Sequence, residues 1–393
     1  MNTKYIVLRR ETALVPEAAN LGARGGIRPF GFGPETLQIE EAELTRAERA
    51  DLRRDPRTRA IAASMPMRLI EPVESGDAAA NAGETWGVRA VRAHESPFTG
   101  DGITVAVLDT GIEPDHPAFQ GVELVRRNFT SEGDDDQNGH GTHCAGTIFG
   151  REVDGLRIGV APGVRRALIG KVLGAGGGSS ATIAQAIQWA VNEGAHVVSM
   201  SLGIDFPGFV DFLVNQEGLD INPATSIALE QYRANVNLFS ELTEFVQAGG
   251  FFGQGTVIVA ASGNESARPR FEIAVAPPAA GNGIVAVGAL QEGANGLSIA
   301  RFSNDQVNVS GPGVNVVSAF PGGRLRALSG TSMATPHVAG VAALWAQKLR
   351  GLTGRVDSQT LVAQLIASGT MSPLAAGFEA DDVGTGVVQA PLN

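Results

Sequence analysis

The chain has 393 residues, enough for one large domain preceded by a small one. A hydrophobic content of 43% predicts a folded core rather than disorder, and a net charge of −11 argues against nucleic-acid binding, which needs a basic face. No apolar run is long enough to predict a membrane span, and the first residues lack the apolar core of a secretion signal.

The single cysteine leaves no pair for an internal disulfide. Such cysteine usage fits a reducing compartment. We therefore predict a cytoplasmic protein, or a secreted one if a signal peptide has been removed.

The N-terminal region differs in composition from the rest of the chain. Residues 5–8 and 67–70 are short apolar runs that predict strands. Residues 43–55 are charged with high helical propensity, and Pro56 marks their end. Residues 22–34 are rich in glycine, arginine and proline and predict a loop. A small α+β unit is expected here.

From residue 86 onward, predicted strands and helices alternate. Residues 103–108, 167–172, 195–200 and 284–287 are apolar runs typical of buried strands. Between the second and third runs, Ser179 can cap a helix that carries apolar residues at helical spacing and stops at Gly194. This alternation predicts an α/β domain whose parallel sheet is covered by helices on both faces.

Three polar residues stand at informative places in this pattern. Asp109 follows the strand 103–108, at the sheet edge where active sites of parallel sheets collect. His140 opens a small-residue helical pattern, and Ser332 lies in Gly-Thr-Ser-Met-Ala before a long apolar helical pattern. A neighbouring base makes a serine hydroxyl nucleophilic, and a carboxylate orients that base. The alternatives are a helix-capping serine and a turn-forming aspartate.

The order Asp109, His140, Ser332, with Ala-Ala-Ser-Gly-Asn-Glu at 260–265, resembles the subtilisin-like serine proteases, or subtilases. The resemblance implies that these three residues form a catalytic triad. It also implies that Asn264 and the Ser332 N–H bind the oxyanion. The expected architecture is a three-layer subtilisin-like fold with a central, mostly parallel sheet covered by helices, preceded by a small α+β prodomain-like region.

The resemblance also implies a domain organisation. Residues 1–75 would be an inhibitory and chaperone region, residues 76–88 a linker with a processing site, and residues 89–393 the catalytic domain. An N-terminal subdomain that is never removed is the alternative. The segment around 204–224 is longer than in compact family members and is expected to be an insertion at the pocket wall.

Subtilases bind an extended peptide as an added strand. Small side chains around the primary pocket favour a large apolar or aromatic residue before the cleaved bond, whereas Glu265 at its rim favours a basic one. By the resemblance, the substrate-binding residues are Gly176, Gly177, Ser201, Leu202, Gly203, Ala261, Ser262 and Gly263.

No cofactor is expected for the chemistry. The acidic run over 132–136 is typical of a solvated loop, so we predict no metal site there. The family's high-affinity calcium site uses an acidic residue where this chain has Ala118, and residues 151–155 match its second loop poorly. We predict that this site is absent or altered, while structural calcium elsewhere stays open.

The sequence thus predicts a serine endopeptidase that works through an acyl-enzyme and is made as a self-processing zymogen. The expected partners are protein or peptide substrates and the chain's own N-terminal region as intramolecular inhibitor, with no nucleic acid and no membrane. Two alternatives remain: an occluded regulatory or binding protein of subtilase fold, and an esterase or peptide ligase using the same acyl-enzyme.

Overall fold

A computed structural model describes residues 4–12, 35–77, 82–248 and 255–393. The loop predicted over 22–34 lies outside these residues, and so does part of the predicted linker, residues 78–81. Among the described helices, none is long and apolar enough to cross a membrane.

The large domain is built on an eight-stranded sheet in the order β16-β15-β14-β12-β7-β10-β8, with β17 paired to β15. All its pairs are parallel except β15 with β16, as the strand–helix alternation predicts. The strands are β7 (Thr104–Asp109), β8 (Glu123–Asn128), β10 (Arg166–Lys171), β12 (Val197–Met200), β14 (Val257–Ala261), β15 (Val285–Gly293), β16 (Gly296–Ile299) and β17 (Val309–Pro312).

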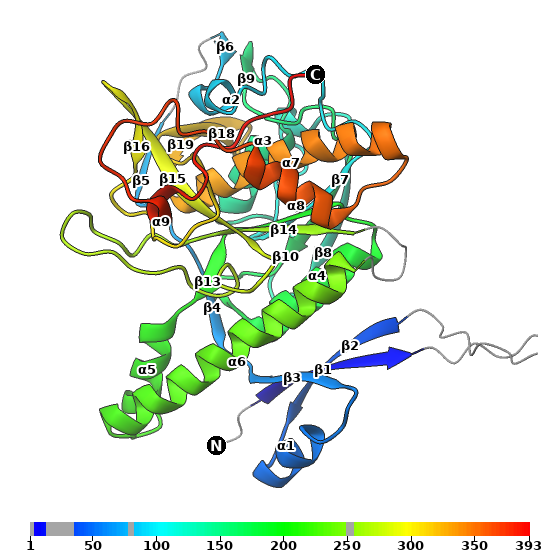
Figure 1. The fold of residues 1–393 in the computed structure, drawn as a ribbon, viewed down its shortest axis with the longest axis vertical. Helices are drawn as coiled ribbons and strands as arrows, with labels where there is room; N and C mark the ends of the chain where they lie inside the picture. Colours follow the sequence, from blue (N-terminus) through cyan, green and yellow to red (C-terminus); the bar gives the residue numbers. More distant parts are fainter. Residues whose placement is uncertain (1–3, 13–34, 78–81, 249–254) are drawn as a thin grey trace, which may run out of the picture.

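Helices cover both faces of this sheet, giving three layers (Figure 1). Alternate side chains of β7 point to opposite faces. Val105 and Val107 join the core with α3 (His140–Phe149), α7 (Thr331–Thr353) and α8 (Ser358–Ala367). Ala106 and Leu108 join the core with α4 (Ser180–Asn192) and α6 (Ile221–Gln247). The predicted fold class is confirmed.

Local signals explain the start and end of α4. The Ser179 side chain accepts a hydrogen bond from the Thr182 N–H, which caps the helix. Gly194 follows the helix with φ of 82°, a left-handed conformation that favours glycine. Both boundaries were predicted from the sequence.

The N-terminal unit is an antiparallel sheet with one helix, lying against α6 (Figure 1). Its strands β1 (Lys4–Thr12), β2 (Glu35–Glu43) and β3 (Thr58–Ala63) pair in the order β2-β1-β3, and α1 (Arg46–Leu52) starts at a Thr45 capping box. The unit is α+β, as predicted.

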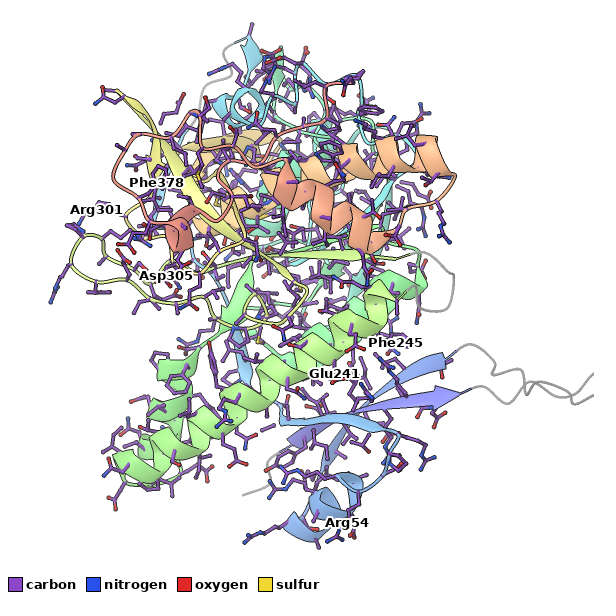
Figure 2. The ribbon with its side chains drawn as sticks, in the orientation of Figure 1. Arg54, Glu241, Phe245, Arg301, Asp305 and Phe378 are labelled. Carbon is purple, nitrogen blue, oxygen red and sulfur yellow. The ribbon has the colours of Figure 1, made fainter. Side chains whose placement is uncertain are left out.

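Specific polar contacts attach this unit to α6. Glu241 and Phe245 lie on the side of α6 that faces the unit (Figure 2). Arg59 donates to Glu241 at 2.9 Å. The side chains of Gln231 and Asn235 bond the N–H and the carbonyl of Ala63, at 3.1 and 3.0 Å. Since Gln231 and Asn235 are buried, these hydrogen bonds fix the register of the unit on the helix.

Short strands and helices complete the chain. Three small sheets have the orders β11-β4-β13, β18-β19-β5 and β6-β9. Residues 204–224 form α5 and the start of α6. The remaining elements are β4 (Pro66–Leu69), β5 (Glu74–Asp77), β6 (Gly83–Glu84), α2 (Trp86–Ala90), η1 (Pro117–Phe119), β9 (Leu156–Arg157), β11 (Gly178–Ser179), β13 (Leu202–Ile204), α5 (Phe206–Asn215), β18 (Val316–Phe320), β19 (Arg324–Ser329) and α9 (Ala380–Val383).

Residues 382–388 resemble the terminal strand of the subtilases in sequence, which predicts a strand there, but the structure contradicts it. α9 ends at Val383, and Val387 makes only isolated bridges to Ser310 and Thr370. Gly384 and Gly386 have φ of 60° and 98°, which breaks the extended backbone that a strand needs.

Candidate active site

Asp109 and His140 form a buried hydrogen-bonded pair. Asp109 is the last residue of β7, and His140 is the first of α3. His140 Nδ1 lies 2.8 Å from Asp109 Oδ1, which also accepts the Thr110 N–H at 2.8 Å. Two hydrogen bonds to one oxygen fix the Asp109 carboxylate. The carboxylate in turn orients the imidazole through Nδ1 and leaves Nε2 facing away from it.

The turn before His140 depends on a residue whose role the sequence did not reveal. Asp136 accepts hydrogen bonds from Thr110 Oγ1, the Gly139 N–H, the Thr142 N–H and Thr142 Oγ1, at 2.7–2.9 Å. The acidic run was predicted to be solvated, but Asp136 is buried, whereas Asp134 and Asp135 are exposed. Asp136 therefore joins the end of β7 to the start of α3.

Asn264 is oriented by Thr331. Its Oδ1 accepts the Thr331 N–H and the Thr331 hydroxyl, both at 2.9 Å. This leaves Nδ2 to donate into the cleft beside Ser332, the second residue of α7. Gly263 precedes it with φ of 119°, and a side chain there would overlap Asn304 and Glu265. The predicted oxyanion donor is thus next to the predicted nucleophile.

A strand of the chain itself fills the cleft. β4 pairs antiparallel with β13, with Leu69 opposite Leu202 and Arg68 opposite Gly203. On its other side, Met67 pairs with Gly178 of β11. The Ile70 N–H donates to the Ser201 carbonyl at 3.3 Å, continuing the ladder toward Ser332. This is a peptide added as a strand between two edges.

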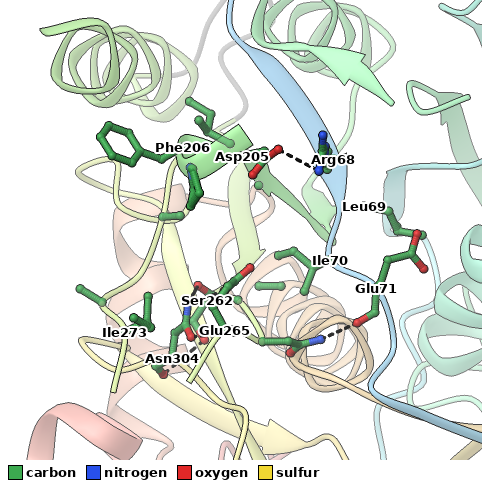
Figure 3. A pocket seen from close by; sticks show the side chains of 18 of the residues that line it. Arg68, Leu69, Ile70, Glu71, Asp205, Phe206, Ser262, Glu265, Ile273 and Asn304 are labelled. Atoms are coloured by element: carbon green, nitrogen blue, oxygen red, sulfur yellow. Dashed lines mark hydrogen bonds and ion pairs between the residues drawn. The ribbon is translucent and has the colours of Figure 1, made fainter. Parts of the chain in front are cut away.

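The catalytic groups contact this strand directly. Ser332 Oγ donates to the Ile70 carbonyl at 2.8 Å. Asn264 Nδ2 donates to the Glu71 carbonyl at 2.9 Å, the dashed line at Glu71 in Figure 3. Within the described residues, buried Nε2 of His140 has no hydrogen-bond partner. The serine hydroxyl is therefore engaged by the strand rather than by the imidazole.

Charge and burial act in opposite directions on His140. Burial favours the neutral ring, but the Asp109 carboxylate outweighs it, and the pKa of His140 is raised well above 6.5. Cys144 Sγ lies 3.7 Å from Nδ1, and burial raises the pKa of this thiol. In the described ranges, one group of side chains could hold a metal ion: Asp109, His140 and Cys144. The Asp109 carboxylate and the His140 imidazole in this group are already hydrogen-bonded to each other.

Three other histidines are buried in the neutral form. Burial lowers the pKa of His143 to about 3, of His196 to about 4 and of His337 to about 4. A histidine whose pKa is lowered by folding binds a proton more readily in the unfolded chain than in the folded protein. The resulting loss of folding free energy is absent above pH 6.5 and grows as the pH falls toward the folded pKa. The pKa of His140 is raised instead, so protonation of His140 favours the folded state.

We expect the free energy of unfolding to fall by about 3 kcal/mol for each of these three histidines between pH 6.5 and about pH 4. Urea unfolding followed by tryptophan fluorescence, on a Ser332→Ala variant to prevent autolysis, measures this fall. His196→Gln should reduce the pH dependence by one proton. A pH dependence that is the same in His196→Gln and in its Ser332→Ala parent would contradict the assignment.

Comparison with known proteins agrees with the arrangement of the active-site residues. The model of the subtilase family matches residues 100–379. The chain belongs to the subtilase family. It is therefore a subtilisin-like serine protease, an endopeptidase class that acts on protein or peptide substrates and needs no cofactor for catalysis.

Individual relatives extend this match. The thermostable alkaline protease of Halalkalibacterium halodurans is 33% identical, over 79% of this chain and 73% of its own. Subtilisin Savinase of Lederbergia lenta is 38% identical, over 67% of this chain and 84% of its own. An intracellular serine protease of Paenibacillus polymyxa is 33% identical, over 68% and 74%.

The cleft of this subtilase has a cavity on each side of β4. One, of about 780 Å³, is lined by the predicted pocket residues Gly203 and Ala261 to Gly263. Phe206 and Tyr232, from α5 and α6, extend its wall (Figure 3 labels Phe206). The other, of about 710 Å³, is lined by Gly176 and Gly177. The cavities thus lie beside the segments predicted to bind substrate.

The residues at the family's calcium position do not fit the ion. Ala118 supplies no side-chain oxygen, and its carbonyl accepts the Arg151 N–H at 2.7 Å. The Arg151 guanidinium reaches the Val164 carbonyl at 2.9 Å, so a cation of the protein lies in this region. Calcium requires six to eight oxygen ligands, which this arrangement does not offer.

Proposed function

We propose that this subtilase hydrolyses peptide bonds with Ser332 as nucleophile, His140 as general base and Asp109 as the carboxylate that orients it. The observation that carries the proposal is the position of the bound strand. A peptide carbonyl lies on the Ser332 hydroxyl, beside a histidine fixed at 2.8 Å by Asp109, and the next carbonyl lies on the Asn264 amide. These are the groups that acyl transfer needs.

In the reaction, His140 Nε2 takes the hydroxyl proton as Ser332 Oγ bonds to the peptide carbonyl carbon. The Asn264 amide and the Ser332 N–H stabilise the resulting oxyanion. Collapse breaks the C–N bond, and the protonated imidazole gives its proton to the leaving amine. Water, deprotonated by His140, then hydrolyses the acyl-enzyme and restores the hydroxyl.

The same geometry supports synthesis as an inhibited zymogen. The β4 strand runs through the cleft as a substrate would, and its unit is anchored on α6 by Gln231 and Asn235. The Ile70 carbonyl accepts from Ser332 Oγ, while Asn264 donates to the following carbonyl, so the Asn264 amide is not on the carbonyl that contacts the nucleophile. The strand keeps the register of a substrate but lacks this oxyanion contact, so it blocks the cleft without being cleaved quickly.

We propose the bond between Ile70 and Glu71 as the processing site, upstream of the predicted linker 76–88. The hydrogen bonds of Ile70 with Ser201 and Ser332 support this bond. Residues beyond it stay in the cleft, because Val73 N–H bonds Ser329 and β5 pairs with β19.

The pocket supports a preference for a large apolar residue before the cleaved bond. Its walls are mainly small or apolar, and the Ile70 side chain lies against them near Gly203. Glu265 at the rim is engaged with the Asn304 amide at 2.7 Å, which disfavours the alternative of a basic residue there.

Labelling with a fluorophosphonate, which reacts with activated serines, tests the proposal. We expect the wild-type enzyme to lose residues 1–70 by intact mass, and then to carry one label that peptide mapping assigns to Ser332. A protein that stays whole but labels has a resident N-terminal subdomain. A protein that stays whole and refuses the label contradicts the enzyme proposal and supports the occluded regulatory alternative, which the filled cleft favours.

A further inference from the structure

We propose that Asp205 selects substrates with a basic side chain at the third residue before the cleaved bond. The inference rests on the proposed function, because it takes the β4 strand as the guide to how a substrate lies in the cleft. It adds a specificity residue from the segment 204–224, which lines the same cavity as Gly203 but contacts the third residue before the cleaved bond rather than the first.

The strand register defines the position. Ile70 carries the carbonyl bound by Ser332, so Leu69 is the second residue before that bond and Arg68 the third. Arg68 pairs in the ladder with Gly203, two residues before Asp205. Its Nη1 lies 2.9 Å from Asp205 Oδ2 (Figure 3). Any arginine held in the same register would bring its guanidinium to the same carboxylate.

Asp205 is fixed independently of Arg68. It is the N-cap of α5, and its Oδ1 accepts the Gly208 N–H at 3.1 Å. A side chain at position 208 would overlap the carboxylate, so Gly208 makes room for it. The carboxylate lies at the N-terminus of α5, where the helix dipole is positive. The carboxylate is therefore already oriented before a substrate arrives.

The second oxygen of this carboxylate is reserved for the ion pair. Among the described residues, Oδ2 makes no hydrogen bond, and Arg68 is its ion-pair partner. The Asp205 side chain is only 16% exposed, whereas Arg68 is 69% exposed. A partly desolvated carboxylate attracts a cation more strongly than a fully exposed one. When residues 1–70 leave, this oxygen is open to the incoming peptide.

A role in docking the N-terminal unit alone is the competing explanation. That unit already has the Arg59–Glu241 pair and the buried hydrogen bonds of Ala63 on α6. If docking were the only role, Asp205→Asn would weaken binding of the released unit and leave peptide selection unchanged.

The test compares two fluorogenic amides, acetyl-Met-Arg-Leu-Ile and acetyl-Met-Gln-Leu-Ile, on self-processed wild type and Asp205→Asn. We expect wild type to prefer the arginine peptide about fivefold in kcat/KM, mainly through KM, and the variant to treat both peptides alike. The preference should shrink toward unity in about 1 M salt. Asparagine can still cap α5, so the fold is retained.

A second variant keeps the proposal open to contradiction. Asp205→Lys should reverse the preference, favouring acetyl-Met-Glu-Leu-Ile over the arginine peptide. An arginine preference that is equal in all three enzymes, or absent from wild type, overturns the inference while the proposed function stands. If the amides turn over too slowly, protection of Ser332 from the fluorophosphonate by the same peptides gives the same comparison. If Ser332 takes no label, the proposed function and this inference fail together.

Discussion

Ser332→Ala is expected to lower kcat for peptide hydrolysis by at least about 10⁵-fold and to leave the chain at full length. Without the hydroxyl, no acyl-enzyme forms, and His140 has no proton to transfer. The bound strand loses only the hydrogen bond from Ser332 to Ile70, so the fold and the occluded cleft remain. Hydrolysis of a fluorogenic peptide and intact mass measure the two effects.

Ser298→Ala provides the control for this substitution. Ser298 lies in β16, the edge strand of the sheet, where it accepts a hydrogen bond from Gln291, and it lines neither cavity of the cleft. This variant should process and turn over like wild type. Residual activity above about 1% in Ser332→Ala would place the nucleophile elsewhere, because a missing nucleophile leaves far less than that. If the Ser332→Ala chain is shortened although it does not hydrolyse the peptide, another protease has cleaved it.

The sheet and the place of Asp109 at its carboxyl edge were predictable because their signals are local, whereas the triad was expected from the family resemblance. Residues 103–108 alternate between two buried faces, and an aspartate follows at the carboxyl end. Ser179 and Gly194 mark the ends of α4 with their own backbone chemistry. Such features need only a few neighbouring residues to be recognised.

Contacts between distant segments could not be derived in this way. Ser332 bonds Ile70 across 262 positions, and nothing near either residue specifies that partner. The sequence suggested a prodomain segment in the cleft only through the family resemblance, without the register that pairs Arg68 with Gly203. Asp136 looked like one charge in a solvated run, because its hydrogen-bond donors belong to Thr110 after β7, to Gly139 and to Thr142 in α3, which only the fold brings together.

The contacts of the insertion around 204–224 could not be derived from the sequence either. From the sequence, the phenylalanines of the segment 204–224 are consistent both with packing on the body of the domain and with a pocket wall. In the structure Phe206 does both, since it contacts Tyr232 edge-on at 5.6 Å and lines the cavity. The preceding residue is Asp205. Its role in binding a basic side chain can be inferred only from its ion pair with Arg68, a residue of another segment.

Asp109→Asn is expected to lower kcat by about 10⁴-fold, with little effect on folding. The amide oxygen can keep the hydrogen bonds from Thr110 and His140, but the negative charge that stabilises the imidazolium is lost. Because Asp109 is what raises the pKa of His140 against burial, its removal should lower that pKa. The acidic limb of the pH–rate profile should therefore move to lower pH while the plateau falls.

This pairing of effects separates the proposed role from simple damage. A structural defect would lower the rate at every pH and leave the limb in place. Asp135→Asn is the matched control: Asp135 precedes His140 in the same loop, but its side chain is 86% exposed and pairs only at 3.8 Å with Arg126. It should change neither rate nor limb. A limb that stays fixed in Asp109→Asn would mean that His140 titrates independently of Asp109, and the base assignment would have to be given up.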